Sequence, residues 1–218
     1  MHPHDENRPV TQAQLGGYLA GHPAGYRAGL RQPSIRAQLD VIVPQDVDIP
    51  RMASELLERF GIEPLPPATQ IRRTLTDAEN TAQAFTWQVM SLALELLNAI
   101  RIPCFERGLI LDVTTVDDSR RLYRASFLFA TVDHINPEWI VRCLRKARQL
   151  LAELATPDLH DETVEQLLEN LHEQFVENGR KQIFGGDATI PVLKTAYSLN
   201  VPFMHLGSGI YQLGWGRY

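Results

Sequence analysis

Cysteine, long apolar runs and strong charge of one sign are all scarce in this sequence. Cys104 and Cys143 are the two cysteines among 218 residues, too few and too far apart for a disulfide framework or a zinc knuckle. Both are expected to be reduced, in a cytoplasmic protein. No apolar run approaches the ~18 residues of a membrane-spanning helix, and the first residues, MHPHDENRP, lack the order of a secretion signal.

The charges nearly cancel, which argues against one class of partner. Lys and Arg total 21, Asp and Glu total 26, and the net charge is −5. A protein that binds nucleic acid through the phosphate backbone needs a basic patch or stripe, and the sequence shows no such pattern. We therefore expect no nucleic-acid partner, and the lack of a long apolar run leads us to expect no membrane partner.

The pattern of apolar residues predicts an α+β fold. Segments near 38–43, 107–116 and 121–132 are typical of strands and are expected to form a small antiparallel or mixed sheet packed with long helices. The expected helices, which start at caps or prolines and stop at glycines or loops, cover about 50–60, 77–100, 136–155 and 161–178.

Composition divides the chain into three parts. Residues 1–36, rich in Gly, Pro and Arg, are expected to form an irregular arm. Residues 37–155 would be an α+β domain, and 156–218 a helical connector followed by a helix–strand–strand unit. The strands of that unit, 203–206 and 210–213, are too short to be stable as an isolated pair. They need a partner sheet that the rest of the chain does not obviously supply.

The helix expected at 77–100 is apolar nearly all round and has one polar stripe. The stripe consists of Gln88, Ser91, Glu95 and Asn98. Because these positions recur at steps of three and four, they lie on one side of the helix. A mostly buried helix would therefore show one narrow edge to something polar.

Arginines cluster around the hairpin expected between 107 and 132. A guanidinium can bind a carboxylate through two parallel N–H groups, so these side chains are candidates for recognising an acidic substrate. A solvated charged rim is the alternative interpretation of the same residues. The stripe and the arginines together give the candidate substrate-binding residues Gln88, Glu95, Arg107, Arg121 and Arg124.

No catalytic residue and no metal site are predicted. The seven histidines are scattered, and none has the spacing of a zinc hydrolase. The Gly185-Gly186-Asp187 step before a helix offers N–H groups to an anion, but a simple turn with Asp187 as the cap is the alternative. Ser208 lies between two glycines without the following helix that a nucleophile elbow requires.

The stretch ATIPVLKTAYSLNVPFMHLGSGIYQLGWG, residues 188–216, resembles the segment that opens the ATP-grasp part of cyanophycin synthetases. The features that match are the Val201-Pro202 turn, the strand at 203–206, and Gln212-Leu213-Gly214 followed by Gly216. Upstream, the stretches ALELLNAIRIP and LYRASFLFATVDHINPEWIVRCLRKARQLL also resemble that family, in the family's order.

This resemblance covers roughly 37–218 and implies part of an ATP-dependent carboxylate–amine ligase. Such enzymes use ATP and Mg²⁺ to activate a carboxylate as an acyl phosphate, which an amine then attacks. Residues 37–155 would dock on the ligase and present substrate, and 156–218 would be the connector and the first piece of the ATP-grasp unit. The residues that bind nucleotide and metal lie beyond 218 in the family. The chain alone is therefore expected to hold no cofactor and to be inactive, with a ligase region in cis or in trans as its partner.

Some family members carry an H-x-x-E-H zinc motif on the long helix. The corresponding positions here are Trp87, Met90 and Ser91, which supply neither imidazole nor carboxylate, so the comparison implies no zinc site.

Two other functions stay open. The chain can be a freestanding interaction module that dimerises through its C-terminal helices and edge strands. It can also be a small-molecule enzyme whose pocket combines Gln88, Ser91 and Glu95 with the nearby arginines.

Overall fold

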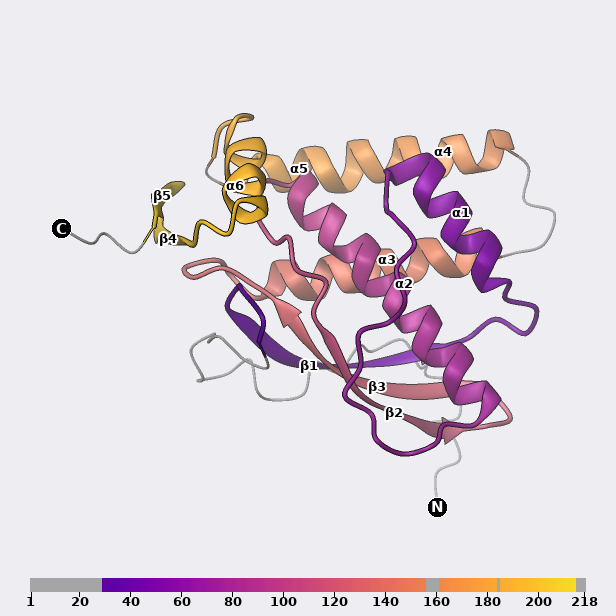
Figure 1. Ribbon diagram of the computed structural model, residues 1–218. Helices are drawn as coiled ribbons and strands as arrows, with labels where there is room; N and C mark the ends of the chain where they lie inside the picture. The colour runs from indigo at the N-terminus through magenta and orange to yellow at the C-terminus, as the bar shows by residue number, and fades with distance from the viewer. Residues whose placement is uncertain (1–28, 156–160, 184, 215–218) are drawn as a thin grey trace, which may run out of the picture.

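The α+β class is confirmed by the computed structural model, which describes residues 29–155, 161–183 and 185–214. Its main sheet contains β1 (Ser34–Ile42), β2 (Leu109–Asp117) and β3 (Leu122–Ala130), all antiparallel, in the order β1-β3-β2. Figure 1 shows the helices on one side of this sheet. No helix in the described ranges is long and apolar enough to cross a membrane.

Strand β1 begins at Ser34 rather than at the expected residue 38, so the sheet reaches back into the segment 1–36. Residues 1–28 of the expected arm lie outside the described residues. Ala37 pairs with Phe127 and Leu39 with Ala125, and all four side chains are buried against the helices. The inward-facing residues of β1 therefore fill the core between sheet and helices.

Helix α2 (Asp77–Ala99) is the centre of the core. Its first turn is closed by a capping box, in which Thr76 accepts from Glu79 N and the Glu79 carboxylate accepts from Thr76 N. The sequence predicted this helix to within one residue. Apolar residues on most of its circumference are buried, because the sheet covers one side and α3 (Glu138–Leu154) packs on another.

Two further helices lie within two residues of their expected bounds. Helix α1 (Ile49–Phe60) is capped at its start by Asp48, whose side chain accepts from Arg51 N, and at its end by Gly61 in the left-handed conformation, φ 65°. The start of α3 is stabilised by Asn136, whose Oδ1 accepts from Glu138 N at 3.0 Å.

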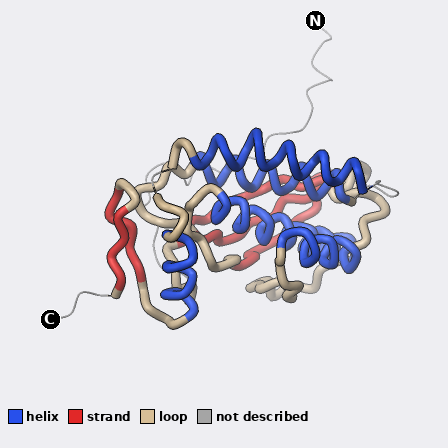
Figure 2. The backbone as a smooth tube through the Cα atoms, turned by 90° about the horizontal axis from the view of Figure 1, so that it is seen from above, coloured by secondary structure: helices blue, strands red, loops and turns tan. Residues whose placement is uncertain are grey.

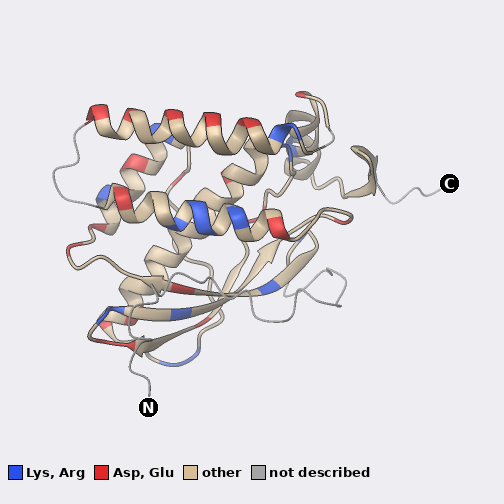
Figure 3. Ribbon diagram, turned by 180° about the vertical axis from the view of Figure 1, so that it is seen from behind, with Lys and Arg blue, Asp and Glu red and all other residues tan. Residues whose placement is uncertain are grey.

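The single helix expected at 161–178 is divided by a π-helical turn. Helix α4 (Asp161–Leu171) continues through η1 (His172–Val176) into α5 (Glu177–Arg180). Figure 3 shows Asp and Glu along the outer side of α4, whereas α3 carries Lys and Arg. Gly179 lies so close to the end of α2 that a Cβ there would be 2.5 Å from Ile100 Cγ2.

At each outer edge of the main sheet, one backbone carbonyl accepts a hydrogen bond from an arginine. On the β1 side, Arg148 of α3 donates to Asp40 O at 2.8 Å. On the β2 side, Arg73 donates to the carbonyl of Val113, and residues 68–70 pair with the backbone of Ile110. These contacts satisfy edge groups that another strand could otherwise pair with.

The C-terminal unit has the predicted order of helix, strand and strand. It consists of α6 (Thr189–Ser198), β4 (Phe203–Gly207) and β5 (Ile210–Leu213). The two strands form an antiparallel sheet of their own, which Figure 2 shows at one end of the molecule, apart from the main sheet.

Replacing Gly108 with alanine is expected to destabilise the protein strongly. Gly108 has φ 90°, and a Cβ there would lie 2.0 Å from the backbone oxygen of Leu128. The expected loss in free energy of unfolding is about 3 kcal/mol or more. Gly61→Ala is the matched control, because Gly61 also has positive φ but no atom lies within 4 Å of the new Cβ; it should cost only about 1 kcal/mol. Urea unfolding measures both, and equal losses would contradict the close contact.

Glu79 is expected to make stability depend on acidic pH. Hydrogen bonds from Arg73 lower the pKa of this mostly buried carboxylate to about 2 from 4.5. The ionised carboxylate therefore stabilises the folded protein at pH values above 4.5, and this stabilisation is lost as the pH falls toward about 2. Glu79→Gln should therefore flatten the loss of stability over this range in urea unfolding, whereas Glu169→Gln, an exposed position on α4, should not. Parallel pH profiles for wild type and Glu79→Gln would refute this role.

Candidate functional site

The β4–β5 hairpin presents an apolar face to solvent. Its strands alternate, so Phe203 and His205 are buried toward the rest of the molecule while their neighbours point away. The outward side chains Met204, Leu206 and Ile210 are 40%, 51% and 61% exposed. Three large apolar side chains side by side on one short hairpin form a contiguous surface typical of an interaction site.

The edges of this hairpin are unpaired within the described residues. Strands β4 and β5 bond to one another, and Gly214 N extends the ladder by donating to Pro202 O at 2.7 Å. The structure describes no arginine that donates to these edges, whereas Arg148 and Arg73 each donate to one carbonyl at an edge of the main sheet. The hairpin therefore offers both backbone hydrogen-bonding groups and apolar side chains to a further strand.

His205 fastens the hairpin to the loop before α3. Its ring Nδ1 donates to Asp133 O at 2.7 Å, and its Nε2 accepts from Gly209 N at 3.2 Å. These two bonds define a neutral imidazole with its proton on Nδ1. The ring also stacks on Tyr211 with centroids 4.6 Å apart. Both nitrogens of this buried side chain are thus occupied by structural bonds.

A cavity of ≈ 320 Å³ lies beside this anchor and is lined by His134, Trp139, His205 and Ser208, among others. The rings of His134 and His205 are 6.2 Å apart between centroids. Because His205 Nε2 accepts from Gly209 N, it is not available as a base for Ser208. The geometry therefore gives no nucleophile–base pair between these two residues.

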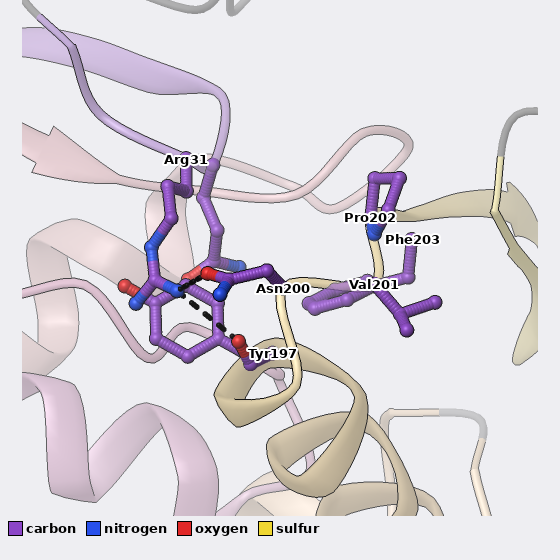
Figure 4. A pocket seen from close by; sticks show the side chains of 7 residues that line it. Arg31, Tyr197, Asn200, Val201, Pro202 and Phe203 are labelled. Carbon is purple, nitrogen blue, oxygen red and sulfur yellow. Dashed lines mark hydrogen bonds between the residues drawn. The ribbon is translucent and has the colours of Figure 1, made fainter.

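A second groove, of ≈ 280 Å³, lies where the segment before β1 meets the C-terminal unit (Figure 4). Arg31 Nη1 donates to Tyr197 O at 3.2 Å and to Asn200 Oδ1 at 2.6 Å. Its guanidinium carbon lies 3.7 Å from the centre of the Tyr197 ring. The opposite wall is apolar and consists of Val201, Pro202 and Phe203. We call this site the Arg31 groove.

Gln32 holds the backbone beneath the Arg31 groove. Its buried side chain accepts from Phe105 N at 2.6 Å and Glu106 N at 3.1 Å, and donates to Pro103 O at 2.9 Å. Arg31 N in turn donates to the Glu106 carboxylate at 2.6 Å. Burial, reinforced by Glu106, raises the pKa of Tyr197, so its phenol stays protonated.

The predicted polar stripe of α2 is largely covered. Gln88 and Ser91 are 7% and 2% exposed, and Ser91 Oγ donates to Trp87 O at 2.9 Å. Glu95 is half-buried and lies close enough to Arg107 to act on its charge. Burial lowers the pKa of Arg107, and the carboxylates of Glu95 and Glu63 oppose that shift. The structure therefore brings Glu95 and Arg107 together.

The other two candidate arginines make structural contacts elsewhere. Arg121 Nε donates to Val43 O at 3.0 Å. Arg124 binds both carboxylate oxygens of Asp40, at 2.7 and 2.9 Å, which raises the pKa of Arg124. Arg121 lies at the β2–β3 turn and Arg124 lies within β3 opposite Thr114, so both are nearer that turn than Arg107, which precedes β2. The five predicted residues therefore do not form one site.

Arg31 and Tyr197 were not among the predicted site residues. They lie 166 positions apart, and Arg31 falls in the segment that was expected to be an irregular arm. The sequence held one indication of this site. Asn200 is a residue type that tolerates the left-handed conformation at the end of a helix, and it does have φ 58°. That conformation directs its side chain toward Arg31 (Figure 4).

The described residues contain no group of three or more His, Cys, Asp or Glu side chains that could hold a metal ion. Comparisons with protein-family models, with curated proteins and with solved structures found no match to this chain.

Replacing His205 with phenylalanine is expected to loosen the hairpin. The substitution keeps an aromatic ring against Tyr211 but removes the bonds to Asp133 O and Gly209 N. Local stability should fall by about 1–3 kcal/mol, seen as faster amide hydrogen exchange in β4 and β5. His172→Phe, at an exposed position of η1, is the control and should leave this exchange unchanged. Unaltered exchange in His205→Phe would show that His205 does not anchor the hairpin.

Proposed function

We propose that this chain is the docking and substrate-presenting region of an ATP-dependent carboxylate–amine ligase similar to cyanophycin synthetases. The observation that supports this best is the β4–β5 hairpin, with its open edges and outward apolar face, in the stretch that resembles the start of an ATP-grasp unit. A hairpin of this kind is the natural first piece of a larger sheet.

Addition of a strand from the ligase region would complete this sheet. The new strand would bond to the open edge of β4 or β5 and cover Met204, Leu206 and Ile210. Full burial of each such side chain contributes about 1.5–3 kcal/mol. Because these side chains are already partly buried, each would gain about half of this, so the backbone hydrogen bonds of the added strand and further contacts would have to contribute as well.

The division of chemistry follows from this arrangement. The ligase region would bind ATP and Mg²⁺ and form the acyl phosphate, while this chain would hold the acceptor or donor substrate. Among the predicted substrate-binding residues, Arg107 is the best placed to receive a carboxylate. It is half-buried beside Glu95, and its side chain makes no hydrogen bond to another described residue.

The DNA that follows codon 218 gives the most direct test. An open frame, or an adjacent gene, that encodes an ATP-grasp lysine and acidic metal ligands would support the proposal. A stop codon without such a gene nearby would contradict it. Where the region exists, it should release ADP in the presence of ATP, an amine and a carboxylate substrate once this chain is supplied.

Aspartate substitutions on the hairpin then test the docking surface. Met204→Asp and Leu206→Asp should lower ADP release by about tenfold or more, because each places a charge in the buried contact. Leu57→Asp is the matched control, since Leu57 is 46% exposed on α1, away from the hairpin. Equal activity of all three variants would refute docking through this face.

A homodimer formed through the same face is the second candidate. The open strand edges favour it, because an identical hairpin can pair with them across a two-fold axis. Light scattering distinguishes the two functions. A dimer that Leu206→Asp converts to a monomer would support the homodimeric interaction module. A wild-type protein that is monomeric at all concentrations would exclude it.

A further inference from the structure

We propose that protonation of His205 opens the turn between β4 and β5 and that deprotonation closes it. This turn, residues 207–209, joins the two strands that carry the outward apolar side chains Leu206 and Ile210. A proton taken up from solvent would therefore reshape the exposed face of the hairpin. The proposal concerns this chain alone and does not depend on the ligase assignment.

The hydrogen bond that closes the turn requires a ring nitrogen without a proton. Gly209 N donates to His205 Nε2 at 3.2 Å, while His205 Nδ1 donates to Asp133 O at 2.7 Å. A charged imidazole carries a proton on both nitrogens. The proton added at Nε2 would point at the N–H group of Gly209, so the charged ring cannot accept this bond. The bond to Asp133 O would remain, because Nδ1 is a donor in both states.

The closed turn holds one residue in an unfavourable backbone conformation. Gly207, Ser208 and Gly209 have φ 100°, 51° and 76°. Glycine adopts positive φ readily, whereas the Cβ of Ser208 makes this conformation costly. Loss of the bond from Gly209 N would therefore allow the turn to relax toward another conformation.

The cavity of ≈ 320 Å³ provides space for this change. His205, Ser208 and Gly209 all line it, so the ring and the turn border the same space. A charged group without hydrogen-bond partners is costly inside a protein. Water that enters this polar cavity can accept from the new N–H group at Nε2 and so hydrate the charged ring.

The aromatic ring that stacks on His205 stays neutral over the range in which histidine side chains change charge. Burial raises the pKa of Tyr211 to about 12, and the nearby thiol of Cys104 adds to that shift. Burial also raises the pKa of Cys104. Neither group therefore ionises between pH 5 and pH 8.

Charges of both signs lie around the His205 ring. The loop before α3 contributes His134, whose ring centroid is 6.2 Å away, and the carboxylate of Asp133. Trp139 also lines the cavity, and the guanidinium carbon of Arg142 lies 5.1 Å from the centre of its ring. The carboxylate favours a charged imidazole, whereas Arg142 and a protonated His134 oppose it. Because these influences partly cancel, the bond from Gly209 N decides which form the closed turn accepts.

An NMR titration of the full chain from pH 8 to pH 5 tests the proposal. Proton–nitrogen correlation spectra of the His205 ring should show a proton on Nδ1 throughout and a second proton on Nε2 as the pH falls. Over the same range, the Gly209 amide should lose protection from hydrogen exchange by about tenfold or more, after correction for the intrinsic effect of pH. The Gly214 amide, which donates to Pro202 O at the other end of the hairpin, should keep its protection. A Gly209 amide equally protected at both pH values, or unprotected while Nε2 carries no proton, would overturn the proposal.

Two variants test whether the pH response belongs to His205. His205→Gln has no charge to gain, and its side-chain oxygen can accept from Gly209 N, so the turn should no longer respond to pH. His134→Asn is the matched control, because asparagine tolerates the φ of 59° at this position and removes the neighbouring imidazole. It should keep the response of the Gly209 amide. A response that persists in His205→Gln, or disappears in His134→Asn, would assign it to another group and exclude His205. If His205→Gln loosens the hairpin, the ring titration of the wild type still decides.

Discussion

A strand at the border of a sheet exposes backbone N–H and C=O groups that need partners, and the two sheets of this molecule differ in how many of these groups are bonded. In the main sheet, Arg148 and Arg73 donate to carbonyls at the two borders. Arg73 is itself held by Glu79, which also caps α2, so one ion pair joins the start of the central helix to the edge of the sheet. The β4–β5 hairpin has no equivalent among the described residues, and its role as a surface follows from that difference.

The fold was predictable wherever local chemistry determines structure. The almost continuous apolar surface of α2 gave its limits to within one residue, and Gly61 ended α1 as expected. The start of β1 was missed because the Gly, Pro and Arg residues of 1–36 indicated an irregular arm, although residues 34–37 belong to the strand. The π-helical turn in η1 leaves no signature in apolar periodicity, so one continuous helix was the natural prediction.

The candidate sites were less predictable because they depend on contacts distant in sequence. Polar residues on α2 were interpreted as an edge toward a pocket, yet Ser91 bonds within its own helix, which periodicity cannot reveal. Arg107 and Glu95 do approach each other, as a shared site would require. Arg31 and Tyr197 meet only through the folded chain, and no local pattern in either segment indicates the partner.

The contact of Gly179 with Ile100 constrains how the helical segment before it can change in length. One inserted or deleted residue between 161 and 178 would rotate the following turn by about 100°. Gly179 would then no longer face Ile100, and a residue with a Cβ in its place would collide with Ile100. The wide turn of η1 accommodates an extra residue without this rotation, as π-bulges do. Related sequences should therefore vary freely in the acidic side chains of α4 but vary in length only together with η1.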